Sequence, residues 1–256
     1  MDKVKVVMLV CDVASSRIIY HKLKTRCEIV AIVMEEKVSS KILLKNRVKK
    51  LGFFRVFGQV CFMVLNVFLK KLSKQRIKEI QQNYDLDTSS IDFQNTISVK
   101  SINDDRVKEV LSDYDFDMVL VNGTRIIKNE ILSTTDKPFV NTHTGITPKY
   151  RGVHGGYWAL ANDDKNNCGV TVHLVDGGID TGNVLYQSLI QVTHNDSFNT
   201  YPYLQTTKAI DLLENVFNDV KNYGLKPKKP LTKDSALWSH PTVFEYIKNY
   251  IKLGVK

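Results

Sequence analysis

Val4-Lys5-Val6-Val7-Met8-Leu9-Val10, an apolar run near the start of the chain, predicts the first strand of the fold and is too short for a secretory signal. A helix is predicted to follow over residues 14–24, and a second strand over residues 28–33. Alternation of strand and helix is typical of a parallel sheet that helices cover on both faces. The start of the chain therefore predicts an α/β fold with a Rossmann-like, doubly wound and mostly parallel sheet.

The same alternation continues through the rest of the chain. Further strands are predicted over residues 96–99, 117–121, 139–141, 170–175 and 184–192. Helices are predicted over residues 103–112, 156–162 and 198–223. A last helix should begin near Thr242, whose side chain can cap the first turn.

Residues 37–82 lie between the second and third strands and are predicted to form a helical insertion, longer than a usual connection. We place the main domain, with this insertion, at residues 1–200 and a small C-terminal helical extension at residues 201–256. A length of 256 residues and a hydrophobic fraction of 43% suit such a domain with an appendage.

The cysteines form no close pair, and neither they nor the histidines show a metal-ligand spacing. We therefore interpret the cysteines as reduced thiols of a cytoplasmic protein and expect no metal. The four are Cys11, Cys27, Cys61 and Cys168.

The basic charge of the chain is concentrated in one segment. The net charge is +9, but residues 37–79 contain twelve Lys or Arg and a single acid, Glu79. This segment therefore carries +11 and the rest of the chain −2.

Within the basic segment, residues 52–69 are apolar nearly all round a helix. A membrane-spanning helix needs about 20 largely uncharged residues, and Arg55, Gln59 and Asn66 disfavour it. We expect a buried or dimer-forming helix. Peripheral docking on an anionic membrane is the second interpretation. Nucleic acid binding is a weaker third and is not expected.

Asn141-Thr142-His143 follows an apolar run and is predicted to lie at a strand end, where α/β sheets bind ligands. In extended backbone the amide of Asn141 and the imidazole of His143 leave the same face, so that both can point at one carbonyl oxygen. Asp180 lies in a glycine-rich loop after another strand and could favour an imidazolium or relay a proton. This set suits transfer of a one-carbon acyl group onto an amine. Taken singly, each residue is better explained as an ordinary turn, surface or loop residue.

Several motifs occur together in this order: Asn141-Thr142-His143, Pro148-Lys149-Tyr150-Arg151-Gly152, Gly169-Val170-Thr171-Val172-His173-Leu174-Val175-Asp176 and Asp180-Thr181-Gly182. They resemble the folate-dependent formyltransferases, which include the glycinamide ribonucleotide, methionyl-tRNA and sugar N-formyltransferases. The resemblance implies that Asn141, His143 and Asp180 are catalytic.

The resemblance also implies two loops that hold 10-formyltetrahydrofolate. Residues 119–127 are similar to the family's pterin-binding stretch, and residues 176–180 are similar to its folate loop. The implied cofactor-binding residues are Asn122, Gly123, Arg125, Ile126, Ile127, Asp176, Gly177 and Gly178. We also expect acceptor contacts from Tyr150, Arg151, His154 and Trp158. His173, on an apolar strand, is as well explained as a satisfied core histidine.

The acceptor is inferred from departures from the family pattern. The loop at residues 11–16 lacks the glycine-rich phosphate cradle of glycinamide ribonucleotide enzymes, and the chain after residue 192 is short for the extra barrel domain of methionyl-tRNA enzymes. We expect a nucleotide-linked amino sugar, as in surface polysaccharide biosynthesis, with Arg151 or the basic segment meeting the diphosphate. Glycinamide ribonucleotide or methionyl-tRNA formylation, and a non-catalytic folate- or sugar-binding homologue, are the alternatives.

Overall fold

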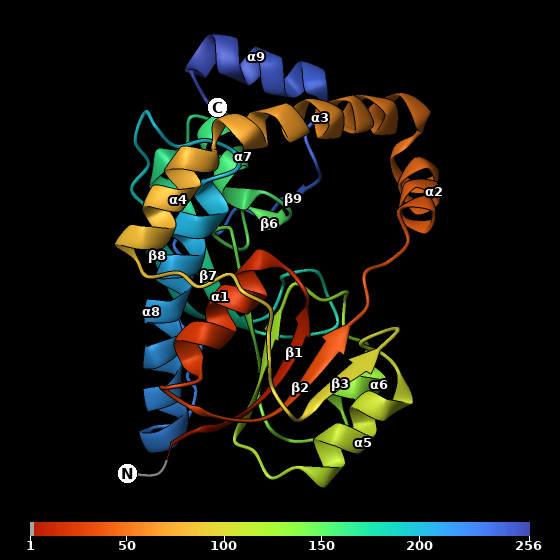
Figure 1. The fold of residues 1–256 in the computed structure, drawn as a ribbon, viewed down its shortest axis with the longest axis vertical. Coiled ribbons are helices and arrows are strands. Elements are labelled where there is room, and N and C mark those ends of the chain that lie inside the picture. Colours follow the sequence, from red (N-terminus) through yellow and green to blue (C-terminus); the bar gives the residue numbers. More distant parts are fainter. Residues whose placement is uncertain (1–2) are drawn as a thin grey trace.

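The computed structural model describes residues 3–256 and contains one seven-stranded, mostly parallel sheet (Figure 1). The first five strands in sheet order are parallel to one another, and the sixth and seventh continue the sheet in antiparallel pairings. In sheet order the strands are β3 (Thr96–Val99), β2 (Glu28–Glu35), β1 (Lys5–Cys11), β4 (Met118–Asn122), β5 (Phe139–His143), β7 (Gly169–Leu174) and β8 (Val184–Leu189). The prediction of a doubly wound, mostly parallel α/β fold is confirmed.

The central strands are apolar because both of their faces are buried. Along β1, Val6, Met8 and Val10 belong to one hydrophobic cluster, whereas Val7 and Leu9 belong to the other. Successive side chains of a strand point to opposite faces of the sheet, so a single apolar run fills two core layers.

Helices cover both faces of the sheet (Figure 1). On one face α8 (Tyr201–Asn222) packs against α1 (Ala14–Leu23) and against β7 and β8. On the other face lie α5 (Asp105–Asp113) and α6 (Asn129–Leu132). Although α8 falls within the range that we assigned to the C-terminal extension, its buried residues share one core cluster with β1.

The predicted helical insertion is confirmed and consists of three helices. They are α2 (Ser40–Leu51), α3 (Phe53–Leu72) and α4 (Lys74–Asn83). Arg76 of α4 pairs with the buried Asp196 at 2.9 Å, which fastens the insertion to the turn before α8. β8 ends at Leu189, before the predicted end at residue 192, and α8 starts at Tyr201, after the predicted start at residue 198.

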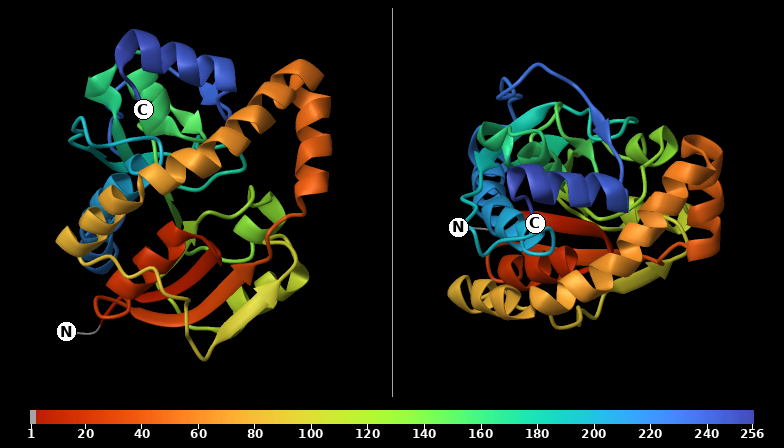
Figure 2. Two further views of the ribbon diagram at one scale, coloured as in Figure 1. Left: turned by 45° about the horizontal axis from the view of Figure 1, so that its top comes forward. Right: turned by 90° about the horizontal axis from the view of Figure 1, so that it is seen from above.

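The expectation that the apolar helix is buried is wrong for this single chain. In α3 the buried residues are Val56, Gly58, Gln59 and Phe62, while Phe54 is 88% exposed. The helix lies across one side of the body and packs against α9 (Val243–Leu253), so its opposite side has no cover (Figure 2).

Four short elements complete the region above the sheet. The turn helix α7 (Gly155–Ala161) is followed by a 3-10 turn at Lys165–Asn167. Strand β6 (Arg151–Gly152) pairs in parallel with β9 (Leu237–Trp238), which brings the C-terminal segment beside the end of β5. Thr242 caps α9 as predicted, in a capping box with Glu245.

We predict that Leu120→Ala lowers the free energy of unfolding by about 2–5 kcal/mol, because Leu120 is fully buried in the core beneath β4 and the truncation leaves a cavity. Urea unfolding followed by circular dichroism measures this. Leu189→Ala is the matched control, since Leu189 is 42% exposed and should cost well under ~1 kcal/mol. Equal losses for the two variants would contradict the placement of β4 at the centre of the core.

Candidate active site

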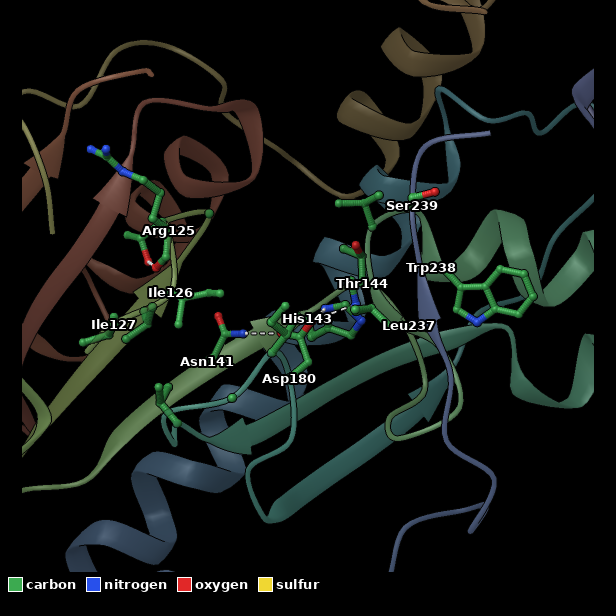
Figure 3. A pocket seen from close by; sticks show the side chains of 18 of the residues that line it. Arg125, Ile126, Ile127, Asn141, His143, Thr144, Asp180, Leu237, Trp238 and Ser239 are labelled. Carbon is green, nitrogen blue, oxygen red and sulfur yellow. Dashed lines mark hydrogen bonds and ion pairs between the residues drawn. The ribbon is translucent and has the colours of Figure 1, made fainter. Parts of the chain in front are cut away.

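A pocket of about 930 Å³ opens where β4 and β5 end, between the sheet, the helical insertion and the C-terminal segment (Figure 3). Ten of the residues proposed from the sequence line it: Asn122, Gly123, Arg125, Ile126, Ile127, Asn141, His143, Asp176, Gly178 and Asp180. Segments far apart in the chain therefore converge on one cavity.

Asn141, His143 and Asp180 lie together on the floor of the pocket (Figure 3). One carboxylate oxygen of Asp180 lies 3.4 Å from Nδ1 of His143, and the other lies 3.5 Å from Nδ2 of Asn141. The two strand residues leave the same face of β5, as their spacing predicted.

Asp180 reaches this place because its loop folds back over the sheet. β7 runs antiparallel to β5, so its carboxyl end lies beside Val140, at the opposite end of β5 from His143. The loop from residue 175 to 183 returns from there, and Asp180 adopts a left-handed backbone with φ of 50°. The backbone N–H of Gly152 donates at 2.9 Å to Oδ2 of Asp180, the carboxylate oxygen that also lies near His143.

The environment keeps Asp180 ionised. Burial raises its pKa, but the neighbouring imidazoles of His143 and His173 and the hydrogen bond from the Gly152 N–H outweigh that effect and lower the pKa to about 2. Burial lowers the pKa of His143, and the Asp180 charge opposes this. Nε2 of His143 donates to the Tyr150 carbonyl at 2.7 Å, so Nδ1, facing the carboxylate, is the atom that can gain or lose a proton.

His173 is a member of the site that the sequence left undecided. Its Nδ1 donates to the Leu174 carbonyl at 2.7 Å, which leaves Nε2 to accept from the amide of Asn141 at 3.1 Å. His173 is therefore both a satisfied buried histidine and a wall of the pocket, where it orients Asn141. Its register opposite Asn141 in the β5–β7 pair brings the two together.

Buried polar contacts brace the loop after β4. The side chain of Asn122 accepts from the hydroxyls of Ser15 and Ser16 and donates to Thr142. Arg125 points away from the pocket and pairs with the buried Glu35, Nε to Oε1 at 2.7 Å (Figure 3). Both side chains thus shape the loop, although their positions line the cavity.

The residues present fit the pterin of 10-formyltetrahydrofolate. Ile126, 51% exposed, lines the pocket together with Val175 and Ile179 from the opposite loop. Apolar side chains from two facing loops suit a flat aromatic ring, and the loop backbones supply polar groups at its edge. Gly177 packs against Asn129 and does not line the cavity.

The structure does not place the four expected acceptor residues on the pocket wall. Tyr150 and Trp158 are buried, where Tyr150 donates to Asp164 and Trp158 donates to the Ser239 carbonyl. Arg151 donates to the Ile179 carbonyl and so supports the loop that carries Asp180. Contacts with segments distant in the sequence hold these side chains inside the protein, and a motif alone cannot reveal such contacts.

His154, the fourth expected acceptor residue, begins a half-buried chain of hydrogen bonds, the relay. Its Nε2 lies 2.9 Å from Nδ1 of His240, whose Nε2 lies 2.9 Å from Nη2 of Arg47. Because Arg47 can only donate, His240 accepts through Nε2 and donates from Nδ1 to His154. The relay holds the guanidinium of Arg47 on the pocket wall.

A basic wall faces the catalytic floor. It is formed by Arg47, Lys50 and Arg55, from the facing ends of α2 and α3. The other side of the mouth comes from Leu237, Trp238, Ser239 and His240. The sequence identified the basic segment by its charge but contained no local signal that residues 237–240 belong to the site.

The mostly parallel α/β sheet thus brings an amide, an imidazole and an ionised carboxylate together in one pocket, a set that suits acyl-group transfer. The family model for Formyl transferase matches residues 3–209, and the chain belongs to this family. This is the family that the sequence motifs resemble.

Curated relatives are similar over part of their length. The methionyl-tRNA formyltransferase of Caldanaerobacter subterraneus subsp. tengcongensis is 30% identical over 112 residues, 44% of this chain and 36% of the relative. That of Finegoldia magna is 33% identical over 106 residues, 41% of this chain and 34% of the relative. The matched region thus spans about a third of these relatives.

Solved structures share the fold over most of the chain. A Mycobacterium tuberculosis protein described as a candidate sugar N-formyltransferase superposes with a TM-score of 0.57 at 14% identity, covering 98% of this chain and 87% of that chain. The phosphoribosylglycinamide formyltransferase of Anaplasma phagocytophilum gives a TM-score of 0.56 at 14% identity, covering 92% and 98%.

We predict that the His154–His240 relay makes the protein sensitive to acid. Burial and the neighbouring His240 and Arg47 lower the pKa of His154 to about 3. The pKa of histidine in the unfolded chain is about 6.5. Between this pKa and the folded one, the unfolded chain binds more protons, so the free energy of unfolding falls as the pH is lowered through that range. Between about pH 7 and about pH 5, the free energy of unfolding of His154→Gln should therefore fall by about 2 kcal/mol less than that of the wild type.

Urea unfolding at the two pH values measures the difference. His194→Gln is the control, because it removes an exposed histidine that lies outside the relay. A His154→Gln variant with the wild-type pH dependence would show that the relay is not held in its neutral form.

Proposed function

We propose that this formyltransferase transfers the formyl group of 10-formyltetrahydrofolate to the amine of an amino sugar carried on a nucleotide. The observation that carries the proposal is that one pocket contains the trio of Asn141, His143 and Asp180, two loops that fit a pterin, and a basic wall. The four free cysteines suit a cytoplasmic enzyme.

The trio can serve each demand of the reaction. When the amine nitrogen bonds to the formyl carbon, charge develops on the formyl oxygen, and preorganised donors stabilise it. Asn141 donates its second N–H weakly, at 3.5 Å to Asp180, so this N–H is available to the oxygen. His143, once protonated at Nδ1, shares its proton with Asp180 and adds positive charge nearby.

The reaction moves a proton from the amine to the leaving nitrogen, and Asp180 is placed to carry it. As the new C–N bond forms and the bond to the donor nitrogen breaks, the amine loses a proton and the leaving nitrogen gains one. Ionised Asp180 can accept that proton, directly or through water, and pass it on with His143 beside it. The backbone N–H of Gly152 holds the carboxylate in place during this exchange, and His173 orients the amide of Asn141 beside it.

The basic wall supports a phosphorylated acceptor. Arg47, Lys50 and Arg55 line the same cavity as the trio, and guanidinium and ammonium groups bind phosphate oxygens by charge-assisted hydrogen bonds. A nucleotide diphosphate placed there would leave its sugar amine directed toward Asp180. Such a product fits the biosynthesis of surface polysaccharides.

Methionyl-tRNA is the second candidate acceptor, because the curated relatives carry that name. It also bears phosphates that a basic wall can bind. Glycinamide ribonucleotide and a non-catalytic binding role remain as further outcomes. The test compares turnover of three acceptors with 10-formyltetrahydrofolate: nucleotide-linked amino sugars, methionyl-tRNA and glycinamide ribonucleotide. Preference for methionyl-tRNA or glycinamide ribonucleotide would overturn the proposed acceptor.

His143→Ala and Asp180→Asn should each lower kcat by about 100- to 1000-fold, because each removes a group that acts on the reacting atoms. Single-turnover formyl transfer measures the effect. Fluorescence titration with a non-transferable folate should show unchanged binding. Wild-type turnover in the His143→Ala variant would rule out the role of His143, and absence of turnover in the wild type with every acceptor would favour a binding protein.

Lys50→Gln should raise the KM for the nucleotide-linked acceptor by about 10-fold and leave the KM for the folate unchanged, since Lys50 lines the wall of the pocket. Lys49→Gln is a matched control, because Lys49 is the exposed neighbour of Lys50 and lies outside the pocket. Steady-state kinetics of the two variants test this. Equal effects would assign Lys50 to general charge rather than to a phosphate contact.

A further inference from the structure

One side of α3 carries a continuous exposed apolar stripe. Phe53, Phe57, Val64 and Phe68 recur at helical spacing on this side, and each is more than half exposed. At one end of the stripe the rings of Phe53 and Phe57 stack. The full exposed apolar set of α3 is Phe53, Phe54, Phe57, Met63, Val64, Val67, Phe68 and Leu72.

The neighbouring helices extend this apolar surface. α9 packs alongside α3, as the view from above shows (Figure 2), and Phe244 and Ile251 of α9 are each 75% exposed. α2 contributes Ile42, Leu43 and Leu44, also exposed. We call these three helices the apolar face. Contiguous exposed apolar surface of this kind marks an interaction site.

The apolar face is also strongly basic. α2 and α3 contain no acidic residue. The exposed basic residues on α2, α3, α4 and α9 include Lys41, Lys45, Lys49, Lys70, Lys71, Lys74, Lys78, Lys248 and Lys252. Two acids of α4 and α9, Glu79 and Glu245, pair with Arg76 and Arg55 and so add no free negative charge to the face.

We propose that the apolar face docks the enzyme on an anionic membrane, with α3 lying in the plane of the interface. An amphipathic helix with aromatic residues on one side and lysines around it binds there through apolar burial and attraction to anionic lipids. A second copy of the chain meeting it through the same face would bring two sets of lysines together, whereas anionic headgroups neutralise them.

α3 docks on the membrane rather than spanning it. Phe53–Leu72 is long and apolar enough to cross a bilayer. Its inner side, however, is joined to the body by polar contacts: Gln59 donates to the His240 carbonyl at 2.8 Å, and Asn66 accepts from Asn199 at 2.8 Å. Gly58 packs so closely on Thr242 that an added Cβ would clash. Insertion would break all three contacts.

Docking would set the mouth of the pocket at the bilayer surface. Arg55, on the basic wall, follows directly after Phe53 and Phe54 at the start of α3. A sugar diphosphate held at the membrane would then meet the basic wall. This last consequence rests on the proposed function, whereas docking itself does not.

Co-sedimentation with vesicles tests the proposal on the full chain. We expect binding to vesicles of phosphatidylcholine and phosphatidylglycerol, weakened by salt, and little binding to phosphatidylcholine alone. Phe54→Ser combined with Phe57→Ser and Phe68→Ser should reduce binding more than ~10-fold. Tyr223→Ser with Leu231→Ser is the control, because these residues are 69% and 58% exposed and lie away from the apolar face.

A charge variant separates the two contributions. Lys70→Gln and Lys71→Gln should each lower binding by about 5-fold. Equal binding to neutral vesicles, or unchanged binding of the phenylalanine variant, overturns the proposal. A third outcome would also overturn it: the wild type binds no vesicles but is a dimer in sedimentation equilibrium, and the phenylalanine variant is a monomer. That outcome would assign the face to a second copy of the chain. Retention in membranes after alkaline carbonate extraction would instead show a spanning helix.

Formyl transfer to a water-soluble acceptor keeps the two proposals apart. The phenylalanine variant should retain wild-type turnover and a wild-type thermal unfolding midpoint, since its substituted residues lie outside the pocket. Turnover with lost vesicle binding supports docking alone. Vesicle binding with no turnover on any acceptor supports docking and contradicts the proposed function.

Discussion

The buried carboxylate of Asp180 is the interaction on which the site depends. It meets Asn141, His143, His173 and the N–H of Gly152 at distances between 2.9 and 3.6 Å. An unpaired carboxylate in such surroundings would be costly and would take up a proton. These partners instead keep it ionised, at the expense of a left-handed backbone at a residue that is not glycine. The loop around Asp180 is therefore shaped by its charge.

The sheet provides the other half of this arrangement through strand register. Asn141 lies opposite His173 in the antiparallel pair of β5 and β7, so the histidine can orient the amide. Glu35 braces the loop after β4 through Arg125. Asn141 and the histidine that positions it thus come from adjacent strands, which ties this part of the site to the sheet.

Much of this could be predicted from the sequence because it depends on local patterns. Apolar runs at strand spacing, a helical insertion and the capping of α9 by Thr242 all follow from neighbouring residues. The spacing of Asn141 and His143 likewise determined that they share a face. Tyr150, His154 and Trp158, expected as acceptor contacts, lie off the pocket wall, since their motif gives no information on which side chains the rest of the chain will cover.

By itself, then, the sequence determined the strand and helix order, the family and the trio, because each is encoded within short segments. Only the tertiary structure decided which residues surround that trio. Arg47 joins the pocket wall through His240, which lies 193 residues away, and the exposure of α3 depends on which of its sides the body covers. Such contacts arise from packing between distant segments, and one sequence carries no local signal for them.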